Sequence, residues 1–175
     1  MAEEKKGPAV GIVMGSDSDY PMMSECSQTL EKFGIVYEIE VLSAHRTPAR
    51  AHEYATTAMS RGLKIIVAAA GAAAHLAGVM AASTTLPVIG VPMATSALNG
   101  MDALLATVQM PGGIPVATMA IDKAGAMNAA IFAAEILALS DPDIALKLVA
   151  HKKDLEKGVA EKNARLQKQI AEKKK

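Results

Sequence analysis

A histidine and an arginine stand side by side in the segment Ser43 to Pro48, between a predicted strand and a predicted helix. Thr47 is the expected N-cap of that helix, and Pro48 takes its first position, where a missing backbone N–H is harmless. A helix start favours anions, and the forked guanidinium of Arg46 can grip one. His45 beside it can transfer a proton near neutral pH. The segment therefore predicts a site for a small phosphorylated molecule that needs proton transfer.

Two further loops belong to the same edge of the predicted sheet. In an open α/β sheet the ligand lies at the carboxyl ends of the strands, near the point where the strand order reverses. The loops at Gly15 to Asp19 and Gly71 to His75 follow the first and third predicted strands. If the first three strands are neighbours, these loops converge with the segment at Ser43. The three loops together then define one candidate site.

The first loop offers two kinds of ligand group. Hydroxyl groups suit phosphate oxygens, whereas a carboxylate suits the diol of a ribose and repels phosphate. We therefore expect Ser16, Ser18 and Arg46 to face a phosphate and Asp19 to face a sugar. A competing interpretation is that these serine and aspartate residues only cap the next helix, which is their commoner role there. Arg46 supports the binding-site interpretation. The helix dipole disfavours a cation at the start of a helix, so an arginine there indicates a bound anion.

The four histidines are not equally good candidates for the functional site. A single histidine after a strand is more often structural than catalytic, but His45 lies beside the anion site and His75 belongs to the same edge. His52 and His151 are expected at the surface. The histidines and Cys26 show no metal-ligand spacing, and we find neither a nucleophile elbow nor a dinucleotide-binding glycine pattern. We therefore expect no metal.

Alternating strands and helices position these loops. Short apolar runs alternate with amphipathic segments, which calls for a parallel sheet covered on both faces by helices. We therefore expect a three-layer, doubly wound α/β domain. Strands are predicted at 9–14, 36–42, 65–70, 87–91 and 114–121, and helices at 21–33, 48–61, 101–109 and 123–139, with a short helix after the third strand.

The C-terminal segment differs from the rest. A helix is expected from Asp141 nearly to the end, with a narrow apolar stripe that usually packs along another element rather than in a core. The helix either folds back on its own domain or reaches a neighbouring subunit. We expect a single domain at 1–175, with an α/β core at 8–140 and an interface-forming C-terminal helix at 141–173. The stripe comprises Ile144, Leu148, Leu155, Val159, Leu166 and Ile170.

Composition narrows the classes of function. Net charge is zero and the basic residues do not cluster in the body of the chain, so we expect no nucleic-acid partner. The stretch Ile65 to Ala82 is built from Ala and Gly more than from Leu or Phe, so a buried strand and helix are favoured over a membrane span. The single Cys26, and the charged start Met1 to Lys6 without an apolar stretch behind it, predict a cytoplasmic protein.

Short motifs occur at the predicted strand ends, namely MGSDSD at 14–19, SAHRTP at 43–48, GAAAHL at 71–76, GVP at 90–92, SALNG at 96–100, QMPGGIP at 109–115, KAG at 123–125 and NAA at 128–130. In this order the motifs resemble the N5-carboxyaminoimidazole ribonucleotide mutase family of purine biosynthesis. The resemblance implies a flavodoxin-like fold and a homo-octamer with active sites near subunit junctions. It also implies conversion of N5-carboxyaminoimidazole ribonucleotide to 4-carboxy-5-aminoimidazole ribonucleotide, without metal or organic cofactor.

The resemblance also implies roles for single residues. Ser16, Asp19 and Arg46 match substrate-contacting positions of the family, in keeping with the roles expected above. His45 alone can donate a proton as the carbamate breaks and then take the proton from ring carbon 4 after that carbon has attacked carbon dioxide. His75 matches a family histidine with a secondary role. The further substrate-binding candidates are Ser18, Ser43, Gly71 and His75.

Departures from the family pattern leave alternatives open. The family usually has glycine where this chain has Ala69 and Ala72, and proline where it has Ala77. Alanine narrows the allowed backbone and adds a methyl group, so the resemblance determines the pocket near the carboxyl group less closely than the phosphate site. One alternative is the related carboxylase, which adds carbon dioxide directly to aminoimidazole ribonucleotide; that branch has Lys in place of Arg46 and lacks the loop with His75. The other is a non-catalytic, nucleotide-binding module of flavodoxin-like fold.

Overall fold

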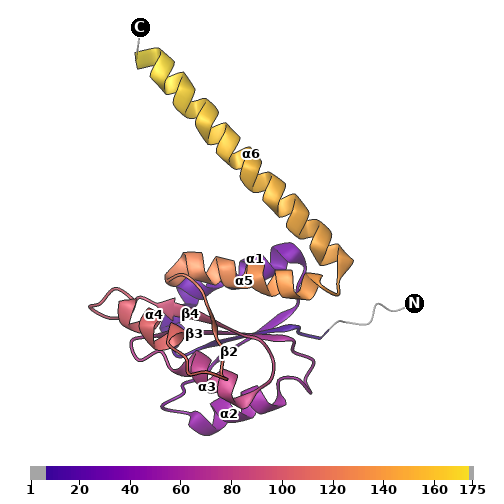
Figure 1. Cartoon of the computed structure of the whole chain (residues 1–175), viewed down its shortest axis with the longest axis vertical. Helices are drawn as coiled ribbons and strands as arrows, with labels where there is room; N and C mark the ends of the chain where they lie inside the picture. Colours follow the sequence, from indigo (N-terminus) through magenta and orange to yellow (C-terminus); the bar gives the residue numbers. More distant parts are fainter. Residues whose placement is uncertain (1–6, 174–175) are drawn as a thin grey trace.

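Five parallel strands form the middle layer of the computed structural model, which describes residues 7–173 (Figure 1). Their order is β2-β1-β3-β4-β5. The chain steps from β1 outward to β2 and then crosses back to β3, so the strand order reverses between β1 and β3. The predicted flavodoxin-like arrangement is confirmed. The strands are β1 (Val10–Met14), β2 (Tyr37–Val41), β3 (Ile65–Gly71), β4 (Val88–Met93) and β5 (Ala117–Thr118).

The expectation that Met1 to Lys6 carries no secretory signal falls outside the described residues. Within residues 7–173, none of the helices combines the length and the apolar character that crossing a bilayer requires. The stretch Ile65 to Ala82 instead forms β3 and most of the short helix α3 (Leu76–Ser83), as predicted.

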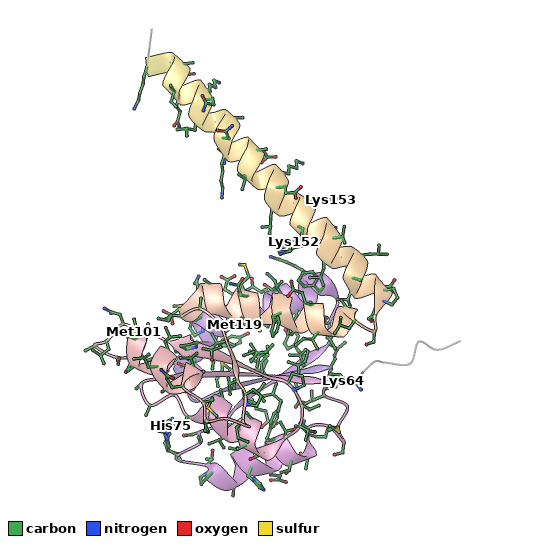
Figure 2. All side chains as sticks on the ribbon, viewed as in Figure 1. Lys64, His75, Met101, Met119, Lys152 and Lys153 are labelled. Atoms are coloured by element: carbon green, nitrogen blue, oxygen red, sulfur yellow. The ribbon has the colours of Figure 1, made fainter. Side chains whose placement is uncertain are left out.

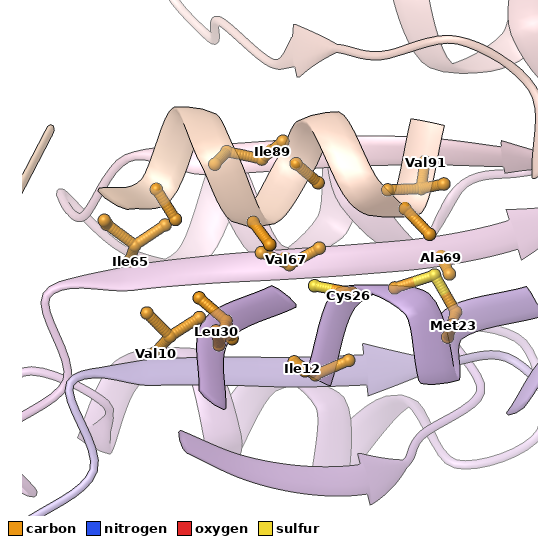
Figure 3. Packing of buried hydrophobic residues seen from close by; sticks show 14 of the residues in the cluster. Val10, Ile12, Met23, Cys26, Leu30, Ile65, Val67, Ala69, Ile89 and Val91 are labelled. Atoms are coloured by element: carbon orange, nitrogen blue, oxygen red, sulfur yellow. The ribbon is translucent and has the colours of Figure 1, made fainter. Parts of the chain in front are cut away.

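Helices α1 (Tyr20–Phe33) and α5 (Asp122–Ala138) cover one face of the sheet (Figure 1). Alternate residues of each strand point to this face, which gives a continuous apolar layer against the helices. Figure 3 shows side chains of three strands and α1 in this layer, with Cys26 among them. Alanines dominate the buried side of α5, so that helix approaches the sheet closely. The strand residues in this layer include Val10, Ile12, Ile65, Val67, Ile89 and Val91.

Helices α2 (Pro48–Thr57) and α3 cover the opposite face, and α4 (Met101–Val108) packs beside β4. Helix α2 ends at Thr57 rather than near residue 61. The chain continues in turns to Gly62, whose φ of +97° is the left-handed conformation that glycine adopts freely. The backbone N–H of Leu63 then bonds the carbonyl of Ala58 at 3.1 Å. Gly62 is thus the stop that the sequence indicates, one irregular turn after the regular helix.

Strand β5 is much shorter than the predicted 114–121. Only Ala117 and Thr118 pair with β4, followed by one hydrogen bond from the N–H of Met119 to the carbonyl of Gly90. The strand lies at the edge of the sheet, and Pro115 has no N–H to donate. Apolar composition alone therefore overestimates the length of this strand.

The long helix α6 (Pro142–Lys173) touches its own domain only at its start. The Asp141 carboxylate accepts the N–H groups of Asp143 and Ile144, and the Lys147 ammonium donates to the carbonyl of Phe33 at 2.7 Å. His151, expected at the surface, is half-buried and packs edge-on against the Phe33 ring.

Beyond its first turns, α6 projects away from the domain (Figure 1). Figure 2 shows Lys152 and Lys153 on this projecting part. Leu155, Val159 and Leu166 of the apolar stripe are each more than half exposed. Of the apolar stripe, Ile144 and Leu148 pack on the helix's own domain, whereas the part from Leu155 onward does not fold back on it.

Candidate active site

A pocket of about 440 Å³ opens at the carboxyl ends of the strands. Loops that follow β1, β2, β3 and β4 all contribute to its wall, on both sides of the point where the strand order reverses. The structure thus brings every candidate residue of the sequence analysis to one pocket. The lining residues are Gly15, Ser16, Ser18, Asp19, Ser43, Ala44, His45, Arg46, Ala70, Gly71, Ala73, His75, Leu76 and Thr95.

The loop after β1 folds into a short 3-10 helix, η1 (Asp17–Asp19). The Ser16 hydroxyl caps it by accepting the N–H of Ser18 at 3.3 Å, and the Ser18 hydroxyl donates to Ser16 Oγ at 2.8 Å. The cap interpretation therefore holds for Ser16, although both hydroxyl groups still line the pocket. Caps of this kind tighten a turn without removing its side chains from solvent.

Asp19 does not cap α1, because its side chain makes no hydrogen bond to the start of that helix. Only 3% of Asp19 is exposed. Burial is the main cause that raises the pKa of its carboxyl group; a backbone hydrogen bond at Ser16 opposes the rise, and the carboxylates of Asp122 and Asp17 add to it. A buried carboxyl group without a capping role is available to a ligand on the pocket side.

Arg46 links the loops after β1 and β2. Its Nη2 donates to the carbonyl of Gly15 at 2.9 Å, and its Nε donates to Ser43 Oγ at 3.3 Å. Among residues 7–173, the ion pairs join other side chains and leave the guanidinium without a carboxylate partner. The fork carries further N–H groups, so it can bind an anion while holding the two loops together.

Thr47 stands immediately before α2, as predicted, but it does not cap the helix. Its hydroxyl accepts the N–H of Ser43 and donates to the carbonyl of Ser43, both at 3.0 Å. The Thr47 side chain points back into the loop, because the N–H and carbonyl groups of Ser43 provide its hydrogen-bond partners there. The result is a closed turn that holds His45 and Arg46 at the pocket rim.

His45 and His75 form a direct pair between the loops after β2 and β3. Nε2 of His45 lies 2.8 Å from Nδ1 of His75, with the rings edge-to-face. Figure 2 shows His75, which directly precedes α3, on the side of the domain opposite Lys64, which precedes β3. One nitrogen must donate and the other accept, so this bond requires at least one neutral ring. The pair can therefore hold and move a single proton beside the pocket.

The three departures from the family pattern lie in β3, in the loop after it and in α3. Ala72 has a φ of +51°, a left-handed conformation that costs an alanine more than a glycine. Ala69 and Ala77 are buried in the two apolar layers of the domain. None of these three residues lines the pocket. Their side chains therefore do not form the wall of the pocket directly.

Thr95 is the polar lining residue that sequence reasoning missed, and the apolar Ala70 and Leu76 also lie outside the three candidate loops. Thr95 follows the end of β4, which is the position that signalled the other loops, but it belongs to no charged or histidine-bearing motif. His52 and the buried Cys26 lie outside the pocket, and burial raises the pKa of the Cys26 thiol to about 12. In the described part of the chain, no group of three His, Cys, Asp or Glu side chains is arranged to hold a metal ion.

Known proteins share this sequence and fold. The AIR carboxylase family model matches residues 9–158. A Pyrococcus horikoshii protein named N5-carboxyaminoimidazole ribonucleotide mutase is 56% identical, over 95% of this chain and 92% of its own. A Bacillus subtilis protein of the same name is 54% identical, over 91% and 98%. The crystal structure of Treponema denticola PurE superposes with a TM-score of 0.81 and 28% identity, covering 91% of this chain and 98% of that one. This chain therefore belongs to the AIR carboxylase family.

Proposed function

We propose that this protein is an N5-carboxyaminoimidazole ribonucleotide mutase in which His45 is the single proton shuttle. The enzyme is an isomerase of purine biosynthesis, like its relatives of the same name. The observation that carries the proton-shuttle proposal is the imidazole pair, 2.8 Å between nitrogens, beside the pocket that Arg46 also lines. A proton carrier and a cationic fork at one pocket suit a phosphorylated substrate that exchanges protons.

The reaction moves a carboxyl group from the exocyclic nitrogen of the substrate to ring carbon 4. His45 protonates the nitrogen as the N–C bond breaks; the electron pair of that bond stays on nitrogen, and carbon dioxide is released into the pocket. Carbon 4 attacks the carbon dioxide, and the now neutral His45 removes the proton from carbon 4. One proton is given and one is recovered, so a single imidazole suffices.

His75 acts through His45 rather than on the substrate. Its hydrogen bond orients the His45 ring and selects which nitrogen of that ring carries a proton. Proton transfer of this kind contributes about 10²–10⁴-fold to a rate. Holding the carbon dioxide against the ring supplies much of the remaining acceleration, because the second step then needs no encounter from solution.

The remaining candidate residues bind the ribonucleotide. Arg46, Ser16 and Ser18 hold the 5′-phosphate, and Asp19 accepts hydrogen bonds from the ribose hydroxyl groups. Ser43 supports Arg46 through its hydroxyl. Gly71 leaves room for the ligand, since it lines the pocket with backbone and has no side chain.

The mutase assignment predicts product without bicarbonate. Purified protein should form 4-carboxy-5-aminoimidazole ribonucleotide from the carbamate substrate with no bicarbonate added, followed by absorbance against a reaction without enzyme. When carbon-13-labelled bicarbonate is present, the product should stay mostly unlabelled, because the carbon dioxide does not leave the pocket. A strict requirement for bicarbonate, with label in the product, would favour the carboxylase. The chain has Arg46 rather than the Lys expected of the carboxylase branch.

We further propose a cytoplasmic homo-octamer. Apolar side chains exposed on the loop before α4 and on α4 itself suit subunit interfaces, as does the stripe of α6. The isolated, buried thiol of Cys26 fits a reducing compartment. Sedimentation at micromolar concentration should give eight times 18.2 kDa, about 146 kDa. A stable monomer would contradict the octamer and leave the α6 stripe without an interface. The exposed residues before and on α4 are Leu98, Met101, Leu105 and Val108.

A further inference from the structure

The wall of the pocket on the side of β4 ends in one polar side chain that the reaction above does not use. Thr95 is the lining residue that follows β4. We propose that its hydroxyl group hydrogen-bonds the heterocyclic end of the ribonucleotide, where the carboxyl group moves, and thereby aligns the reacting atoms. This inference rests on the proposed function and adds a substrate-contacting residue to it.

The Thr95 side chain packs directly against Gly71. A Cβ added to Gly71 would collide with Oγ1 of Thr95 and would stand 2.9 Å from both its Cβ and Cγ2. Two neighbouring strand ends therefore meet at this point, and only glycine lets them approach so closely. The contact places the hydroxyl oxygen on the pocket wall beside the loop that carries His75.

The backbone around Thr95 is tied on both sides. The N–H of Ala94 donates to the Asp122 carboxylate at 2.9 Å, and the N–H of Thr95 donates to the carbonyl of Met93 at 3.0 Å. Further along, the Ser96 hydroxyl accepts the N–H of Leu98 at 3.2 Å. Asp122 makes its bond although its φ of +58° is unusual for a residue with a side chain. These bonds fix the backbone that carries Thr95 before a ligand arrives.

Strand order decides which part of the ligand Thr95 meets. The loops of β2 and β1 lie on one side of the pocket and hold Arg46 and the serines that suit a phosphate, and the ring of His45 reaches from there to His75 in the loop after β3. The loops of β3 and β4 form the other side, where the polar lining side chains are His75 and Thr95. An amino group and a carboxyl group on a heterocycle need hydrogen-bond partners at that end. The apolar or side-chain-free lining residues there are Ala70, Gly71, Ala73 and Leu76.

Thr95→Val keeps the shape of the side chain and removes its hydroxyl group. We expect this variant to bind 4-carboxy-5-aminoimidazole ribonucleotide about tenfold more weakly, the loss of one hydrogen bond. Its affinity for ribose 5-phosphate, which lacks the heterocycle, should stay within about twofold of wild type. Thr95→Ser keeps the hydroxyl group and should bind 4-carboxy-5-aminoimidazole ribonucleotide in preference to ribose 5-phosphate as strongly as wild type does. Both affinities are measured by titration and by competition against the substrate.

Thr85→Val is the matched control, because the same change is made at an exposed threonine before β4, away from the pocket. If Thr95→Val loses the same affinity for both ligands, Thr95 has only a structural role. If it loses affinity for neither ligand, Thr95 does not contribute to binding. If wild type forms no product from the carbamate substrate, the proposed function fails, while the two titrations still decide the role of Thr95. An active wild type with an unaffected Thr95→Val overturns the role of Thr95 alone.

Discussion

Replacing His45 by asparagine should lower kcat by about 10²–10⁴-fold and leave ribonucleotide binding measurable. Asparagine retains a polar side chain of similar reach but cannot carry a proton near neutral pH. The loss should appear in kcat rather than in the dissociation constant of aminoimidazole ribonucleotide, which is measured by titration calorimetry. Circular dichroism spectra should match wild type, since His45 lies at the exposed rim of the pocket.

His52→Asn is the matched control for this variant. His52 lies on α2, is exposed and is outside the pocket, so the same substitution should leave kcat within about twofold. His75→Asn should cost less than His45→Asn, because the His75 side chain orients the shuttle and does not replace it. If both pocket variants lose activity equally, a single shuttle is wrong and the pair acts as a unit. Binding without turnover in wild type would favour the non-catalytic module.

Replacing Arg46 by alanine should raise KM about a hundredfold, because two charge-assisted hydrogen bonds to a phosphate contribute about 3 kcal/mol. Arg46→Lys keeps the charge but loses the planar fork, so KM should rise about tenfold. The affinity for ribose 5-phosphate should fall in parallel in both variants. Steady-state kinetics and a competition titration measure these effects.

Arg50→Ala removes the same charge four residues further on, in the first turn of α2. Its side chain is 63% exposed and pairs with Glu40 outside the pocket, so KM should stay within about twofold. A fall in kcat with unchanged KM in Arg46→Ala would place Arg46 in the chemical step instead of at the phosphate. Arg46 also joins Gly15 to Ser43, so a thermal melt should accompany the kinetics.

Local sequence signals determined most of the architecture. Apolar runs located the strands, and residues such as Gly34, Gly62 and Pro48 located helix ends because each restricts or frees the backbone of its own neighbours. Alternation of strands with helices was enough to predict a parallel sheet, because a parallel connection needs a crossover. Because ligands bind at the carboxyl ends of parallel strands, the strand ends then identified the loops that meet at the pocket.

Contacts between distant loops required the tertiary structure. Three contacts join residues from different strand ends: the hydrogen bond between His45 and His75, the hydrogen bond from Arg46 to Gly15, and the close packing of Thr95 against Gly71. Their distances depend on strand order and register, which no short stretch of sequence encodes. The same reason explains why Thr95 escaped notice: a lone hydroxyl has no pattern of its own.

The ends of the chain show the same division. The sequence alone determined that a polar helix with a narrow apolar stripe follows Asp141, because periodicity is a local property. Only the structure decided that this helix leaves its domain after residues 144 to 151 have packed on it, and that β5 keeps two paired residues. Direction and pairing depend on partners that lie far away in the chain. Helices and their limits are thus local, whereas the pocket, the edge strand and the projecting helix are consequences of packing.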